Sequence, residues 1–545
     1  MLAPVAAIDG ARAALRAGDG AAARNLLQDA DPARGDVSEC LARAAYLLLD
    51  FDAAIELWER AYAAHRDARD QLGAVRVART LAYMNGMVRG DGAVMSGWLS
   101  RAQTLLDGAE ESSEWGWVAL NRGMFEGDRR TKEQRFGEAL TTARRLGDVD
   151  LEIVTLAYLG ASLVHDGRTE EGMMLLDEAL AAVAGHEADD FLVLEEVFCQ
   201  LFSACEHAHD VTRADEWIRV GDAIAARRRL PSVAAFCHTH YGGLLTAAGR
   251  WPEADATLSD AIRLWGGDRR GLRNGALLRL ADLRVRQGRF EEAAQLLDGF
   301  SSDWEAARAM ASIQLARGDT ALARDTLERG LNQVGATSGA AVPMLALLVD
   351  VHLATGALDS AASAVAQLDA CVTPDAGAYV RAVAALARGS VCLASGTGDP
   401  IACMREAVSG FERARLPMEL AHTRLALADA VASDRPEVAI AEARRALEGF
   451  ETLQAARGVD AASALLRSLG ATGATRRRGD GALTKREAEV LALLGHGMSN
   501  PEISDRLFIS RKTVEHHVGN VLAKLGLRSR GEAAAHAVRQ EQGRE

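Results

Sequence analysis

Small and aliphatic residues recur at fixed distances behind glycine along most of this chain. The pattern is a glycine, a small residue five positions later and an aliphatic residue nine positions after the glycine. It occurs at Gly18, Ala23, Leu27; Gly249, Ala254, Leu258; Gly288, Ala293, Leu297; Gly318, Ala323, Leu327; and Gly356, Ala361, Val365. Gly167, Gly172 and Leu176 form a looser copy, and Leu49, Ala54 and Trp58 form another without the glycine.

Each copy predicts a pair of helices joined by a short turn. A glycine at the end of a helix allows the left-handed turn that closes it. The small residue lets the next helix approach closely, and the aliphatic residue packs one turn further on. Such hairpins cannot bury their apolar faces alone, so they stack. We therefore predict an all-α fold with an α-solenoid over residues 1–469.

Three of these segments resemble tetratricopeptide repeats, namely "AAGRWPEADATLSDAI", "RQGRFEEAAQLLDGF" and "LARGDTALARDTLERGL". The resemblance covers roughly residues 10–470 and is clearest over 245–370. The glycines from 249 to 356 are 39, 30 and 38 residues apart, so the repeats are degenerate. An irregular helical bundle without repeat symmetry is the alternative.

The C-terminal part begins with a change in composition. Residues 470–482, rich in Gly, Thr and Arg, have the composition of a flexible linker. Residues 483–545 then carry a succession of helix-start signals. These are the capping boxes Thr484 with Glu487 and Ser529 with Glu532, the N-cap Asn500 followed by Pro501 in the first helical turn, and the N-cap Ser510. Four short helices are expected.

The third expected helix, Ser510 to Leu525, has two distinct faces. Its apolar stripe consists of Val514, Val518, Val521, Leu522 and Leu525. The other face carries Lys512, Glu515, His516 and Gly519. Only "FI" separates this helix from the preceding one, which predicts a steep helix-turn-helix crossing. A polar face with a glycine suits a helix that enters the major groove of DNA.

The stretch "LTKREAEVLALLGHGMSNPEISDRLFISRKTVEHHVGNVLAKLGLRSRGEAAAHA" resembles the LuxR-type DNA-binding domain. In that family the third helix enters the major groove and the fourth commonly forms a dimer contact. The resemblance implies that bases are read by Lys512, Glu515, His516 and Gly519. It implies phosphate contacts for Thr513, Lys524, Arg528 and Arg530. For Glu515 the alternative is an exposed helix position without a DNA contact, because a carboxylate repels phosphate unless a cytosine amino group receives it.

The net charge of −14 is unevenly distributed, which strengthens this interpretation. Residues 476–545 contain 13 Lys and Arg against 9 Asp and Glu, giving +4. Residues 1–475 hold 49 basic and 67 acidic residues, giving −18. Three of the four lysines lie in the C-terminal part, and the fourth is Lys132. Only the C-terminal part has a charge balance suited to phosphates.

The composition favours a helical protein away from membranes. Hydrophobic residues make up 49% of the chain and aromatic residues 5%, with only 10 prolines. Asp9 interrupts the apolar start, so no signal peptide is expected. The longest uncharged stretch, 330–349, is too polar to span a bilayer. We expect a cytoplasmic location, and the seven cysteines without a Cys-x-x-Cys pair favour reduced, mostly buried thiols.

Two other features could carry chemistry in the body. The segments "CEHAHD" and "CHTHY" make Cys205, His209, Cys237 and His240 weak candidates for a zinc site, if each pair lies on one helix face. Helix packing is the favoured explanation, and no metal is predicted. Tryptophans such as Trp98, Trp115 and Trp117 could line a concave ligand surface.

We therefore predict a one-component transcriptional regulator, not an enzyme. A phosphate-binding loop needs a lysine after glycine, but Lys132 follows Thr131. The chain thus resembles the large ATP-binding LuxR regulators without their ATPase domain, and no cofactor is expected. The expected partners are double-stranded promoter DNA, RNA polymerase, a second copy of the chain on DNA, and a small-molecule effector on the solenoid. The alternative makes the solenoid a docking scaffold for a regulatory protein. Activation of transcription is implied by the resemblance alone.

Overall fold

The computed structural model describes residues 2–228, 231–265, 270–335, 338–374, 376–471, 485–507, 511–525, 527 and 529–542. The chain divides into two compact units, Met1–Leu469 and Gly470–Glu545. Every regular element among the described residues is a helix, which confirms the all-α prediction. Within the described ranges, no helix has the length and apolar character needed to cross a membrane.

The first unit is a succession of helices that pack on their neighbours in the chain. Its N-terminal part comprises α1 (Leu2–Arg16), α2 (Gly20–Leu26), α3 (Gly35–Leu47), α4 (Phe51–Asp67), α5 (Gln71–Tyr83), the π-helical η1 (Met84–Arg89), α6 (Gly92–Leu106), α7 (Ser113–Met124), α8 (Arg129–Leu146), α9 (Val149–His165) and α10 (Thr169–Ala184). The middle comprises α11 (Phe191–Ala208), α12 (Val211–Arg228), α13 (Pro231–Ala247), α14 (Trp251–Leu264), α15 (Arg270–Arg286), α16 (Phe290–Leu296), α17 (Trp304–Ala316) and α18 (Thr320–Val334).

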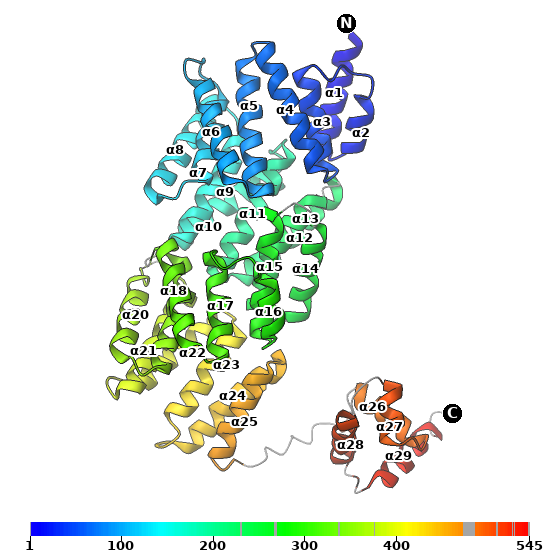
Figure 1. Cartoon of the computed structure of the whole chain (residues 1–545), viewed down its shortest axis with the longest axis vertical. Helices are drawn as coiled ribbons and strands as arrows, with labels where there is room; N and C mark the ends of the chain where they lie inside the picture. Colours follow the sequence, from blue (N-terminus) through cyan, green and yellow to red (C-terminus); the bar gives the residue numbers. More distant parts are fainter. Residues whose placement is uncertain are drawn as a thin grey trace. The chain divides into compact units, whose positions relative to one another are not determined.

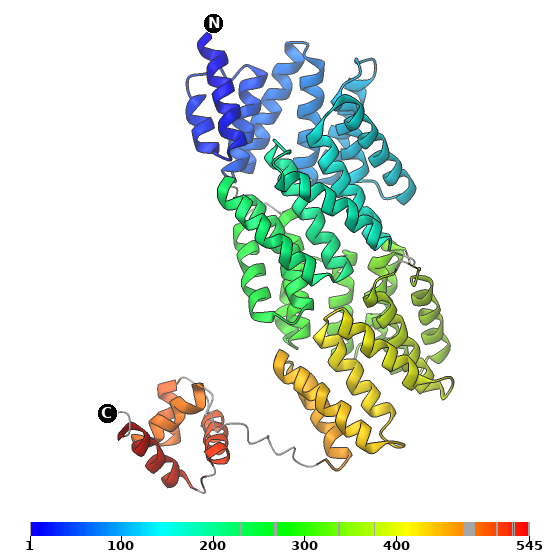
Figure 2. The same cartoon turned by 180° about the vertical axis from the view of Figure 1, so that it is seen from behind.

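The unit ends with the short 3-10 turn η2 (Gly339–Ala341), α19 (Val342–Ala354), α20 (Leu358–Ala370), α21 (Ala378–Ser395), α22 (Pro400–Arg413), α23 (Pro417–Ala430), α24 (Pro436–Leu453) and α25 (Ala456–Ser468). Successive helices lie side by side in antiparallel pairs, with α1 at one end of the unit and α25 at the other (Figures 1 and 2). This stacking of helical hairpins is the α-solenoid that the repeat pattern predicted.

The repeated glycines close helices as the pattern requires. Gly18, Gly249 and Gly318 have φ values of 75°, 76° and 88°, in the left-handed region. The residue after each glycine donates its backbone N–H to the carbonyl five residues earlier, as Asp19 does to Ala14 at 2.9 Å. The small residues that follow, such as Ala23, are fully buried. At Gly172 a Cβ atom would clash with the carbonyl oxygen of Gly160, so two helices touch there through backbone.

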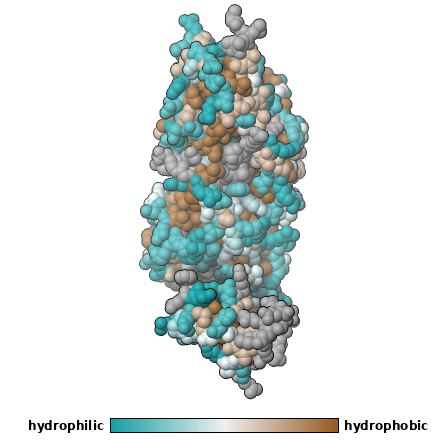
Figure 3. All heavy atoms as spheres, turned by 90° about the vertical axis from the view of Figure 1, so that its right-hand side faces the viewer, coloured by the Kyte–Doolittle hydropathy of each residue, from teal (hydrophilic) through white to brown (hydrophobic). Residues whose placement is uncertain are grey.

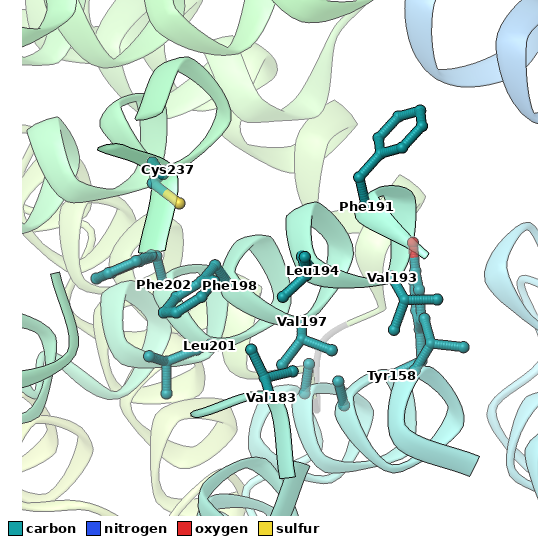
Figure 4. Close-up of a cluster of buried hydrophobic side chains, with 14 of the residues drawn as sticks. Tyr158, Val183, Phe191, Val193, Leu194, Val197, Phe198, Leu201, Phe202 and Cys237 are labelled. Carbon is teal, nitrogen blue, oxygen red and sulfur yellow. The ribbon is translucent and has the colours of Figure 1, made fainter. Parts of the chain in front are cut away.

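The solenoid coils tightly enough to bring distant segments together. Helix α11 lies in its interior, where its apolar residues pack against Tyr158 of α9, Val183 of α10 and Cys237 of α13 (Figure 4). Arg43 of α3 pairs with Asp190 at 2.5 Å, although 147 residues separate them. This ion pair joins α3 to the start of α11.

The candidate zinc ligands are not brought together. The sequence-based geometry placed Cys205 and His209 on one helix face, but α11 ends at Ala208 and His209 adopts φ 54° in a left-handed turn. The His209 ring packs on Tyr379, with ring centroids 4.0 Å apart. His240 Nδ1 lies 2.7 Å from a Glu206 carboxylate oxygen. Among the described residues, no three His, Cys, Asp or Glu side chains form a group suited to a metal ion.

The thiols have the character that the composition indicated. All seven cysteines are free, and Cys40, Cys205, Cys237 and Cys371 are buried. On the face shown in Figure 3, hydrophilic residues are interrupted by hydrophobic patches. The described exposed large hydrophobic residues, such as Met174 and Leu322, belong to different helices.

Candidate nucleic-acid interface

The second unit is built from four described helices. They are α26 (Lys485–Gly495), α27 (Asn500–Leu507), α28 (Arg511–Leu525) and α29 (Arg530–Gln542). Helix α28 packs on the other three, and α26 also packs on α29. A small apolar core holds them together and includes Val490, Leu494, Ile503, Val514, Val521 and Ala533. Helices α27 and α28 therefore form the helix-turn-helix that the short "FI" link predicted.

Side-chain caps fix the ends of these short helices. The prediction placed the cap of α27 at Asn500, but the helix already begins there and Ser499 precedes it. Glu502 accepts hydrogen bonds from the Ser499 backbone N–H at 2.6 Å and from the Ser499 hydroxyl at 2.7 Å. At α29, Ser529 Oγ accepts from the Glu532 N–H at 3.2 Å, which confirms that predicted cap. The predicted caps Thr484 and Ser510 lie outside the described residues.

Two arginines tie the helices to one another. Arg486 of α26 donates to the carbonyl of Leu507, the last residue of α27, at 2.5 Å. A cation at this position donates to a C-terminal carbonyl that has no partner within the helix, and it interacts favourably with the helix dipole. Arg530 donates to Asn500 Oδ1 at 2.5 Å and to the Met498 carbonyl. The sequence did not predict either role, because both contacts join residues more than 20 positions apart.

Arg530 thus has a structural role besides the phosphate contact expected for it. Its two terminal nitrogens hold the start of α29 against the start of α27. A phosphate contact by Arg530 would have to share or replace these hydrogen bonds. Asn500, predicted as a helix cap, serves instead as the acceptor for this arginine.

Helix α28 presents the two faces that its sequence predicted. Val514 and Val521 are fully buried, and Val518 is 9% exposed. Glu515 and Gly519 are exposed, and Thr513 is half-buried. A Cβ atom built on Gly519 would meet no described atom within 4 Å. Packing inside the described part of this unit therefore gives no reason for a glycine at this position.

Other predicted contacts fall outside what the structure describes. The side chains of Lys512, His516 and Lys524 are not described, and neither is any part of Arg528. By sequence position, Lys512 and His516 belong to the same helix as Glu515 and Gly519. The roles predicted for Lys512, His516, Lys524 and Arg528 remain predictions.

Comparison with known families decides what this unit is. Residues 481–537 match the family described as bacterial regulatory proteins, luxR family. This segment is a LuxR-family helix-turn-helix domain. Three curated relatives match over the same domain alone.

The transcriptional regulatory protein LnrK of Bacillus subtilis is 51% identical to the LuxR-family domain over 57 residues, or 10% of this chain and 26% of LnrK. LiaR of the same organism, also a transcriptional regulatory protein, is 49% identical over 57 residues, or 10% of this chain and 27% of LiaR. The oxygen regulatory protein NreC of Staphylococcus aureus is 44% identical over 59 residues, or 11% of this chain and 27% of NreC. The chain therefore spans about a quarter of the length of these relatives.

A solved structure, the APC/C hetero-tetramer Cut9-Hcn1, aligns with 84% of this chain and 95% of its own, at 11% identity and a TM-score of 0.35. A likeness of this degree carries no information on function, and the link to known regulators comes from the LuxR-family domain.

Proposed function

We propose that this protein is a sequence-specific DNA-binding transcriptional regulator. The LuxR-family domain at 481–537 is the observation that carries the proposal. The exposed Glu515 and Gly519 on α28 support it, because a helix that enters the major groove needs a face free of its own core. The C-terminal excess of positive charge complements the phosphates of DNA.

In this proposal Lys512, Glu515, His516 and Gly519 face bases, and Thr513, Lys524, Arg528 and Arg530 meet phosphates. Two copies of the chain bind a site with two half-sites, and α29 forms the contact between them. The solenoid receives a small-molecule signal, and RNA polymerase is the partner at the promoter. The expected effect on transcription is activation.

Two substitutions test the assigned face of α28. Lys524→Ala removes a predicted phosphate contact, so DNA binding should weaken similarly on every sequence, and the salt dependence should decrease by roughly one unit of slope. His516→Ala removes a predicted base contact, so binding to the preferred site should lose about 1 to 3 kcal/mol, with relaxed preference at one or two base pairs. Gel-shift titrations on the preferred site and on point-mutated sites measure both effects.

The matched control is Lys132→Ala, which removes the one lysine that lies in the solenoid. It should leave the affinity and the salt slope unchanged. If His516→Ala kept the sequence preference and Lys524→Ala altered it, the wrong face of α28 would have been assigned.

A further inference from the structure

Two adjoining cavities lie among the N-terminal helices and the start of α11. The outer cavity has a volume of about 340 Å³ and the inner one about 120 Å³. Both are lined by Glu39, Arg43, Arg76 and Asp190. The inner cavity draws its walls from α3, α4, α5, α7, α9 and the start of α11. Concave, mostly preformed cavities of this kind are the usual sites for small molecules.

The inner cavity has an apolar and aromatic body. Trp58, Trp117, Leu120 and Met124 are among its lining residues. Trp117 is held at one edge, because its indole nitrogen donates to Asp148 at 3.1 Å. Its ring is covered by the Arg79 guanidinium, whose carbon lies 4.4 Å from the ring centroid. Such walls suit a flat ring or another compact apolar group.

A cluster of two tyrosine hydroxyls and one carboxylate interrupts the apolar lining of the inner cavity. The hydroxyls of Tyr83 and Tyr158 donate to the two carboxylate oxygens of Glu196, and all three residues line the cavity. A phenolic oxygen that donates one hydrogen bond still accepts another. This cluster therefore offers acceptors to a hydroxyl or amino group of a ligand.

Arg76 and Arg79, which line the inner cavity, have more hydrogen-bond donors than their protein partners accept from. Arg76 donates through Nε and one terminal nitrogen to Glu39, at 2.7 Å each. Arg79 donates through Nε to Glu114 at 2.8 Å. Within the described chain, no acceptor takes the terminal nitrogens of Arg79. The partner carboxylates, by contrast, are engaged, and Arg76 with His65 holds the pKa of Glu39 near 2, despite burial.

Asn121 adds a polar group to the mostly apolar wall of the inner cavity. It is 5% exposed and lines the cavity. Its side-chain amide makes no hydrogen bond with any residue that the structure describes. The amide lines the cavity, so its donor and acceptor groups are open to the molecule that fills the cavity.

We propose that these cavities bind a small aromatic carboxylate, with its ring against the apolar wall that includes Trp117 and its carboxylate on Arg79 and Asn121. The terminal nitrogens of Arg79, next to the aromatic wall, are donors that fit a carboxylate. Calling this molecule the effector rests on the proposed function, whereas the binding itself does not. A hydroxyl on the ring would reach the cluster formed by Tyr83, Tyr158 and Glu196.

Isothermal titration calorimetry of the full chain without DNA tests whether the cavities bind such a carboxylate. The probes are benzoate, 4-hydroxyphenylacetate and indole-3-acetate, each compared with its neutral amide, and tyramine as a cation. We expect at least one acid to bind saturably with one site per chain, its amide at least tenfold more weakly, and tyramine not at all. If no acid binds, or if acid and amide bind equally, the cavities hold only water or another class of ligand and the proposal is overturned.

Two variants locate the site. Arg79→Lys keeps the charge but loses the planar fork, and Asn121→Asp places a negative charge at unchanged size. Each should weaken binding of the acid at least tenfold while the melting temperature and helical content stay near those of the unmodified protein. The control is Arg89→Lys, since Arg89 pairs with Asp52 and lines neither cavity. Equal affinity in Arg79→Lys, Asn121→Asp and Arg89→Lys would place the ligand elsewhere.

The same preparations, tested on DNA, separate the two proposals. If the protein bound no acid but still bound DNA sequence-specifically, the proposed ligand site would be wrong and the proposed regulator function would stand. Acid binding without any sequence-specific DNA binding would leave the cavity and remove the regulator.

Discussion

Gly519 lies within α28, where glycine costs about 1 kcal/mol relative to alanine. It is exposed, and a side chain there would enter open space among the described atoms. We predict that Gly519→Ala stabilises the domain by about 0.5 to 1 kcal/mol and weakens DNA binding at least tenfold, because the methyl group would prevent close approach to the groove. Thermal unfolding and gel-shift titration measure the two effects.

Gly97 provides the matched control for this substitution. It also lies inside a helix, α6, and is exposed, and a methyl group added there would meet no described atom within 4 Å. Gly97→Ala should stabilise the solenoid without changing DNA affinity. If Gly519→Ala bound DNA as tightly as the unmodified protein, the glycine would not mark a close approach.

Single residues also show how far the repeat pattern could be followed. The glycine motif predicted the helix ends at Gly18, Gly249 and Gly318, and each has the left-handed turn. Leu49, in the copy that lacks glycine, has φ 61° and makes the same turn. Tertiary packing supports this conformation in a residue that does not favour it. Turns of this kind at other non-glycine residues, such as Arg415, therefore had no signal in the sequence.

At the scale of helices, α9 and α11 meet through histidines that the fold keeps neutral. The rings of His165 and His207 lie 4.8 Å apart. Burial, followed by the charge of neighbouring histidines, lowers the pKa of His165 to about 4 and that of His207 to about 3. Both values lie below the ordinary value of 6.5, so the unfolded chain binds more protons in this range.

The contribution of the two neutral histidines to the free energy of unfolding is complete above pH 6.5. It is lost as the pH falls from 6.5 towards 4. At pH 5.5 the loss should be roughly 1 kcal/mol for each of the two histidines. Asp150 and Asp350, whose pKa values burial raises to about 6, act in the opposite direction. A comparison of variants is therefore needed to isolate the histidines.

We predict that His207→Gln reduces the fall in melting temperature between pH 7.5 and pH 5.5, because one depressed group is removed. Calorimetric scans at both pH values measure this difference. The exposed His186 supplies the control. The melting temperature of His186→Asn should fall between the two pH values by as much as that of the unmodified protein. A parallel fall for His207→Gln would show that His207 is not kept neutral by the fold.

The arrangement of helices explains why the cavities could not be located from sequence. Trp117 was one of several tryptophans that the sequence offered as ligand contacts. Glu39, Trp117 and Glu196 line one cavity only because the solenoid coils and brings α3, α7 and α11 together. The zinc hypothesis depended on the same missing information, since it assumed that α11 continued through His209.

At the scale of the whole molecule, the chain combines an acidic solenoid with a basic C-terminal unit. The contacts divide the chain after Leu469, and the composition changes in the Arg-rich stretch that follows. Repeats and helix starts carried enough signal to predict both architectures. The roles of the two units and the linker between them remain proposals, since the stretch 472–484 lies outside the described residues.

We predict that trypsin cuts the folded protein first at Arg476, Arg477 or Arg478 and releases the C-terminal unit intact. The physical reason is the low apolar content of this stretch, which gives it no core to join. Mass spectrometry of a short digest identifies the first site. A variant with these three arginines changed to Gln should resist that cut, whereas early cleavage within the repeats of the unmodified protein would contradict the proposed boundary.

Recognition of a DNA sequence by the C-terminal unit can be measured by selection of the full chain on a pool of random DNA. We expect enrichment of one motif with two similar half-sites about one helical turn apart, and loss of that enrichment in His516→Ala. A pool that stays random after several rounds, while the protein still binds DNA in a salt-dependent way, would contradict it.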